Sequence, residues 1–134
     1  MQTDTSRGPL AGPEADRSVP AGGPRWRALL EMQWRARLQE VTELALAYHE
    51  AAAAGGRGTG GSDDDRLQLQ RLRRLQRRTV TSRRALADTE EALARLSAGR
   101  YGRCESCAGA ISAQRLAAMP ETRYCARCAR GRGR

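Results

Sequence analysis

Two long stretches without glycine or proline restrict this chain to a fold built around extended helices. The first runs from Trp26 to about Ala54, and the second runs from about Asp64 to Leu96. Glycine and proline are the residues that most readily interrupt a helix, so their absence over this length favours two long helices.

Apolar residues recur in both stretches at spacings of three and four, which is the period of one helix face. In the first stretch this face comprises Leu30, Trp34, Leu38, Val41, Ala45 and Tyr48. In the second stretch it comprises Leu72, Leu75, Thr79, Ser82, Leu86, Thr89, Leu93 and Leu96. The second face is rich in leucine at both ends but small or polar in its middle, which predicts a marginal coiled coil there.

The segment 55–62 is rich in glycine and has the composition of a flexible linker. Ser62 and Asp63 at its end favour a helix N-cap. Two helices of similar length joined by a short loop predict an antiparallel hairpin, with arms of about 40–50 Å at about 1.5 Å per residue. The base of this hairpin would contain Trp26, Leu93 and Leu96.

The predicted fold class is therefore mainly α: an antiparallel coiled-coil helical hairpin followed by a small four-cysteine zinc finger. Residues 1–24 are rich in Pro and Gly with scattered charge, so we expect this segment to be disordered. We assign the hairpin to 25–98 with its tip at 55–65, the finger to 99–130, and an Arg/Gly tail to 131–134.

All four cysteines of the chain lie in two Cys-x-x-Cys pairs, Cys104 with Cys107 and Cys125 with Cys128. Zinc prefers four tetrahedral ligands, and a Cys-x-x-Cys turn lets two thiolates reach one ion. The 17 residues between the pairs lie in the range typical of a four-cysteine zinc site. Four thiolates leave no open position for water, so we expect one structural Zn²⁺ and no catalytic metal.

Two other interpretations of the cysteines require a context that the sequence does not provide. Two disulfides would require an oxidising compartment, and the first 24 residues lack a secretory signal pattern. A thioredoxin-like redox motif would require a βαβ context, which the helical pattern does not provide. Arg103, Arg115 and Arg127 are near the cysteines in sequence, and we expect them to offset the charge of a zinc–thiolate centre.

Charge and composition narrow the function classes further. The formal net charge is +9, and no apolar run approaches the roughly 20 residues that a membrane span needs. His49 is the only histidine, and no catalytic set of Ser, His and acid or of Cys and His can be assembled. We therefore expect a cytoplasmic, non-enzymatic protein that is monomeric and has no membrane partner.

Residues 99–128 read GRYGRCESCAGAISAQRLAAMPETRYCARC. This segment resembles the C4 zinc finger of the DksA/TraR family of bacterial transcription regulators. The matching residues are Cys104, Glu105, Cys107, Ile111, Arg115, Pro120, Cys125 and Cys128. The resemblance extends loosely through the predicted hairpin to about residue 26, and it implies that Ile111, Arg115 and Pro120 shape the finger.

The resemblance also implies a partner and a mechanism. Family members bind RNA polymerase and insert a coiled coil into its secondary channel, where acidic residues at the tip modulate transcription initiation. Asp64 is the best candidate for such a tip acid, with Asp63 and Asp65 beside it. These three residues also lie where a helix N-terminus favours negative charge.

The second predicted helix is strongly basic and has no acidic residue from 66 to 87. We expect its arginines to pair across the hairpin with glutamates of the first helix, or to remain solvated. A polymerase contact is a second interpretation, and direct binding of nucleic acid through the Arg-rich surface is the alternative function. A module that oligomerises through its coiled coil is a third possibility.

Overall fold

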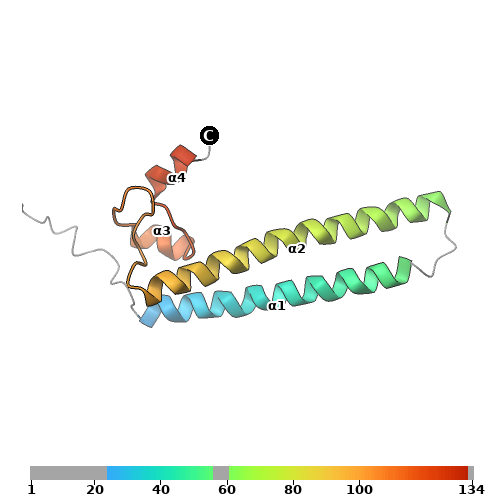
Figure 1. Ribbon diagram of the computed structural model, residues 1–134, viewed down its shortest axis with the longest axis horizontal. Helices are drawn as coiled ribbons and strands as arrows, with labels where there is room; N and C mark the ends of the chain where they lie inside the picture. Colours follow the sequence, from blue (N-terminus) through green and yellow to red (C-terminus); the bar gives the residue numbers. More distant parts are fainter. Residues whose placement is uncertain (1–23, 56–60, 133–134) are drawn as a thin grey trace, which may run out of the picture.

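The computed structural model describes residues 24–55 and 61–132, which form a long helical hairpin with a small finger at one end (Figure 1). The disordered segment predicted for the N-terminus, most of the linker and the last two residues lie outside the described residues. The helices are α1 (Pro24–Gly55), α2 (Ser62–Ser97), α3 (Ala113–Ala118) and α4 (Ala126–Arg132).

The helical hairpin predicted from the sequence is confirmed, because α1 and α2 run side by side in opposite directions (Figure 1). Both helices agree with the predicted bounds to within two residues. The predicted cap of α2 is wrong: Ser62 is already helical, and the N-cap is Gly61, which makes no side-chain capping bond. The three aspartates at 63–65 occupy the first turn of α2, where the helix dipole favours them.

The buried face of α2 follows the predicted heptad pattern. None of the eight predicted seam residues is exposed, and Ser82, Thr89 and Leu96 are fully buried. The Thr79 and Thr89 hydroxyls donate to the carbonyls of Leu75 and Ala85, one turn earlier on the same helix, at 2.7 and 3.1 Å. These internal bonds let polar side chains occupy the seam without a partner on α1.

The predicted seam of α1 is only partly correct. Leu30 is fully buried, but Leu38 is 41% exposed, whereas Leu44 and Ala51 are buried and were not predicted. At about 100° per residue, Leu38 lies about 120° around the helix from Leu44. Selection of apolar residues at spacings of three or four therefore placed Leu38 in the seam although it lies on another side of α1.

The main hydrophobic core lies at the finger end of the hairpin, where three segments of the chain meet. Trp26 and Leu30 of α1 and Leu96 of α2 pack in one buried cluster with residues of the finger. The finger residues of this cluster are Tyr101, Cys104, Ile111 and Leu116. No helix in the described part of the chain is long and apolar enough to cross a membrane.

Candidate metal centre

The finger begins where α2 ends in a glycine turn. Gly99 has φ of 72° and donates its N–H to the Leu96 carbonyl at 3.2 Å. This left-handed conformation is one that glycine adopts without a Cβ clash, so Gly99 ends the helix. Gly102 has φ of 84° and turns the chain again directly before the first cysteine pair.

The first cysteine pair lies in a tight turn closed by backbone hydrogen bonds. The Ala108 N–H donates to the Cys104 carbonyl at 2.9 Å, and the Cys104 N–H donates to the Gly109 carbonyl at 2.8 Å. The Gly109 N–H donates to the Cys107 Sγ at 3.4 Å. Ala108 is the one described non-glycine residue with positive φ, at 61°, so the turn imposes some backbone strain.

The second cysteine pair lies at the start of α4. Cys125 directly precedes the helix and Cys128 is in its first turn, so a single helical turn presents both sulfurs to the same side. The Ala129 N–H donates to the Cys125 carbonyl at 2.9 Å and fixes this turn. The two pairs therefore come from separate local structures that the fold brings together.

The four sulfurs are arranged to hold one metal ion. All four Sγ atoms lie within 4.8 Å of one another, and those of Cys107 and Cys125 are 3.9 Å apart. A tetrahedral zinc with Zn–S bonds of about 2.3 Å requires S···S distances of about 3.8 Å. The four cysteines are free thiols. The set of four soft donors fits zinc and leaves no position for a substrate, which is the chemistry of a structural site.

The protein environment prepares part of this site for deprotonation. Burial disfavours the Cys104 thiolate, but the backbone N–H groups of Cys125 and Cys107 outweigh burial and lower the pKa of Cys104 to about 6. The backbone at Cys128 lowers the pKa of Cys125, whereas the Cys125 side chain raises the pKa of Cys128 to about 12. The thiols resist simultaneous ionisation without a cation, and a divalent metal overcomes this resistance.

The residues predicted to shape the finger have defined positions. Ile111 is buried in the core, and the Pro120 carbonyl accepts a hydrogen bond from the Tyr101 hydroxyl at 2.9 Å. Burial raises the pKa of Tyr101 to about 12, so its phenol remains a donor. The Arg115 Nε donates to the Tyr124 carbonyl at 2.8 Å, directly before Cys125.

The arginines predicted to offset the thiolate charge do not bind the sulfurs directly. Within 61–132, no hydrogen bond joins Arg103, Arg115 or Arg127 to a cysteine sulfur. Arg115 instead holds the backbone that carries the second cysteine pair.

Arg95 anchors the finger to the hairpin, a role that no local sequence pattern indicates. Its side chain is buried and its Nη2 donates to the carbonyls of Glu121 and Thr122 at 3.2 and 3.5 Å. Its Nη1 lies 3.9 Å from Oε1 of Glu105, and Glu105 lies between the first two cysteines in the sequence. Burial lowers the pKa of Arg95, and the charge of Glu105 opposes that effect.

Two further ion-pair groups join the finger to the hairpin. Arg123 of the finger pairs with Asp88 at 3.3 Å and with Glu91, both on α2. Arg37 of α1 lies 3.6 Å from Glu121. Every ion pair among the described residues is at this end of the molecule, so the predicted pairing between arginines of α2 and glutamates of α1 is wrong.

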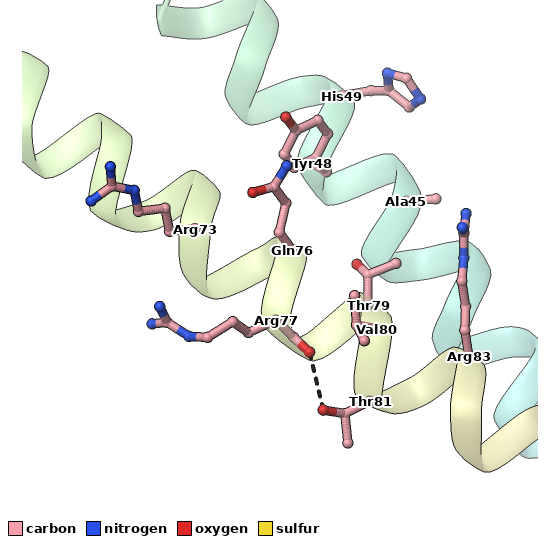
Figure 2. Close-up of a pocket in the computed structure, with 10 residues that line it drawn as sticks. All are labelled: Ala45, Tyr48, His49, Arg73, Gln76, Arg77, Thr79, Val80, Thr81 and Arg83. Atoms are coloured by element: carbon pink, nitrogen blue, oxygen red, sulfur yellow. Dashed lines mark hydrogen bonds between the residues drawn. The ribbon is translucent and has the colours of Figure 1, made fainter.

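The predicted tip acids Asp63, Asp64 and Asp65 are exposed at the opposite end of the hairpin from the cysteines (Figure 1). An open groove of about 820 Å³ lies on the hairpin between these two ends (Figure 2). Tyr48 and His49 of α1 and Arg77 of α2 are among its lining residues. The groove is remote from the cysteines, and its residues form no catalytic set.

Comparison with known proteins agrees with this geometry. The family model of the prokaryotic dksA/traR C4-type zinc finger matches residues 99–132. An uncharacterized protein of Aquifex aeolicus (strain VF5) is 48% identical over 44 residues, which cover 33% of this chain and 30% of that protein. The chain thus matches less than a third of that relative's length.

The whole fold is similar to that of the transcription factor DksA2 from Pseudomonas aeruginosa. The TM-score is 0.74, the alignment covers 92% of each chain, and the sequence identity is 22%. This likeness extends over the hairpin as well as the finger. The chain therefore has the fold of DksA2 and carries a zinc finger of the DksA/TraR C4 type at residues 99–132.

Proposed function

We propose that this protein is a non-enzymatic regulator that binds RNA polymerase and modulates transcription initiation through an acid-tipped coiled coil. The observation that carries the proposal is the combination of a DksA/TraR-type finger with a DksA2-like hairpin in one chain. The four thiols hold one Zn²⁺, which orders the finger and performs no chemistry on a substrate.

The hairpin is the part that would enter the polymerase secondary channel. Its two antiparallel helices form a narrow rod, and the tip acids lie at the end farthest from the finger (Figure 1). Three adjacent carboxylates on an exposed first turn can reach cationic groups or a bound cation at the end of a narrow channel. The finger, anchored by Arg95, supports the other end of the rod.

The proposal places the protein in the bacterial cytoplasm as a monomer with RNA polymerase as its partner. A coiled coil that already pairs α1 with α2 has no need of a second copy to cover its seam. Sedimentation at several concentrations tests this part, and a dimer stable at micromolar concentration would contradict it.

The decisive experiment combines polymerase capture with transcription in vitro. The full-length, zinc-loaded protein should retain RNA polymerase from a bacterial lysate and change the yield of initiated transcripts. The triple variant Asp63→Asn, Asp64→Asn, Asp65→Asn should still bind polymerase but lose its effect on initiation, because the shape is kept and the charge is removed.

A matched control removes three exposed carboxylates of the hairpin away from the tip: Glu40→Gln, Glu43→Gln and Glu90→Gln. This control should retain the effect on initiation. Failure to recover polymerase under mild salt would overturn the proposal, and equal loss of the effect in the two triple variants would overturn the role of the tip.

A further inference from the structure

A row of arginines runs along the exposed side of α2, and two of its members, Arg73 and Arg77, also line the groove shown in Figure 2. At about 100° per residue, Arg66, Arg73, Arg77 and Arg84 lie within about 40° of one another and roughly opposite the seam. We call these four residues the arginine row, and all four are exposed. Figure 2 shows Arg73 and Arg77 extending to the same side of α2.

The arginine row forms the cationic face of α2, and four more exposed arginines lie around the helix from it. At about 100° per residue, Arg74 and Arg83 lie about 80–100° from the row on opposite sides, and Arg71 and Arg78 lie about 120–140° from it, closer to the seam. No acidic residue occurs between 66 and 87, and within the described residues none of these eight guanidinium groups has a carboxylate within ion-pair distance. The structure therefore leaves their charge without compensation from the protein.

The cationic face has defined ends. The tip acids 63–65 precede it, and Asp88 and Glu91, which bind Arg123 of the finger, follow it. Between these ends the arginine row spans about 27 Å at about 1.5 Å per residue. The finger docks on the α2 side just beyond it, so the face is a bounded, exposed strip rather than the whole helix (Figure 1).

The arginine row presents a line of positive charge along one face of the helix. Its four arginines span about 27 Å, which leaves about 9 Å on average between neighbours. Guanidinium groups bind phosphate oxygens in a bidentate fork, with more geometric specificity than a point charge has. The row therefore complements a phosphate backbone in the sign of its charge and in donor type.

The form of the strip favours duplex over single-stranded nucleic acid. Aromatic side chains that would stack on unpaired bases are absent between 66 and 87. The exposed surface is the convex side of one helix, a shape that the major groove of duplex DNA can admit. We propose that the arginine row forms a sequence-independent docking surface for the phosphate backbone of duplex DNA.

This proposal is independent of the polymerase proposal because it concerns a different surface and a different partner. The test measures binding of the full-length, zinc-loaded protein to two labelled 20-base-pair DNA duplexes of unrelated sequence, by fluorescence anisotropy over a range of salt. Both duplexes should bind equally at low salt. The affinity should fall steeply as salt rises, with log K decreasing by about 0.9 per log unit of salt for each phosphate contacted.

The test variant replaces the arginine row: Arg66→Gln, Arg73→Gln, Arg77→Gln and Arg84→Gln. The matched control removes four exposed arginines elsewhere: Arg27→Gln, Arg35→Gln, Arg100→Gln and Arg130→Gln. The row variant should bind at least about tenfold more weakly with a salt slope shallower by about 3–4, whereas the control should keep most of its affinity. Zinc content and circular dichroism establish that both variants fold.

Three results would overturn the proposal. The first is no binding of either duplex at low salt. The second is equal weakening by the two quadruple variants, which would assign binding to net charge alone. The third is loss of polymerase capture in the row variant without any duplex binding by the parent protein, which would assign the strip to a protein partner.

Discussion

The two ends of the hairpin are stabilised in different ways. At the finger end, side chains of α1, α2 and the finger form one buried cluster, and every ion pair among the described residues lies there. Along the middle, α1 meets only α2, through partly exposed residues such as Val41 and Leu75 and small ones such as Ser82. The rod is therefore held firmly at its base and more weakly along its length.

A rod of two helices needs a third segment to build a large core, and in this molecule that segment is the finger at the base. A middle made of two helices cannot bury a large core, because each helix has only one apolar face to share. The finger supplies the third segment that completes a core around Leu30 and Leu96. Zinc binding therefore stabilises more than the finger, since the finger core is continuous with the base of the hairpin.

Loss of zinc should have the largest effect on the finger end. Cys104→Ser removes a buried ligand, and structural zinc sites contribute about 10–16 kcal/mol of apparent binding free energy. The variant should lose its equivalent of zinc and the near-ultraviolet dichroism of Trp26 and Tyr101, whose rings are 5.9 Å apart. Ser106→Ala, an exposed change within the same turn, should keep both. A Cys104→Ser protein with full zinc content and an unchanged spectrum would contradict this prediction.

Two leucines compare the base with the middle of the seam directly. Leu30→Ala removes a fully buried side chain at the base and should lower the free energy of unfolding by about 2–5 kcal/mol. Leu75→Ala, at a partly exposed seam position in the middle, should cost about 0.5–2 kcal/mol. Urea denaturation measures both. Equal costs would mean that the base is no better packed than the middle.

Replacement of Arg95 tests how the finger is held on the hairpin. Arg95→Gln shortens the side chain away from the carbonyls of Glu121 and Thr122 and should lower stability by about 1.5–3 kcal/mol. Arg84→Gln, an exposed change on the same helix, should stay within about 0.5 kcal/mol of the parent. Thermal unfolding of zinc-loaded protein distinguishes them, and an Arg95→Gln protein as stable as Arg84→Gln would remove the proposed anchor.

Ser82 should give the smallest effect, and it should have the opposite sign. Its hydroxyl is buried in the seam without a hydrogen-bond partner among the described residues. Ser82→Ala removes an unsatisfied polar atom and favours the helix, so it should stabilise the protein by up to about 1 kcal/mol. Denaturation of the single variant measures this gain, and a clear loss of stability would show that the hydroxyl has a partner.

Much of the fold could be predicted because its signals are local. The helix bounds follow from glycine and proline positions, and the seam of α2 follows from a regular period that every predicted residue obeys. The cysteine site was also predictable, because metal-ligand spacing is a property of short turns. The prediction for the seam of α1 was wrong at Leu38, because α1 carries leucines on more than one face: Leu44 is buried, whereas Leu38 and Leu46 are exposed.

The contacts between finger and hairpin could not be predicted, because they join residues far apart in the chain. Arg95 and Glu121 are typical surface residues by type, and nothing in the local pattern indicates that one is buried against the other. Glu105 is named in the sequence only as part of the zinc-finger pattern, and in the structure it lies beside Arg95. Burial of a charged side chain depends on tertiary packing, which the period of a single helix does not report.

We infer that zinc holds the finger and the base of the hairpin together as one unit, while the middle of the hairpin is stabilised separately. Amide hydrogen exchange of the full-length protein with and without a zinc chelator tests it most directly. Chelation should speed exchange strongly at 101–128 and also at both helix ends of the base, near Leu30 and Leu96, with little change near Ser82. Faster exchange confined to the finger, or equal acceleration along the whole hairpin, would contradict the claim.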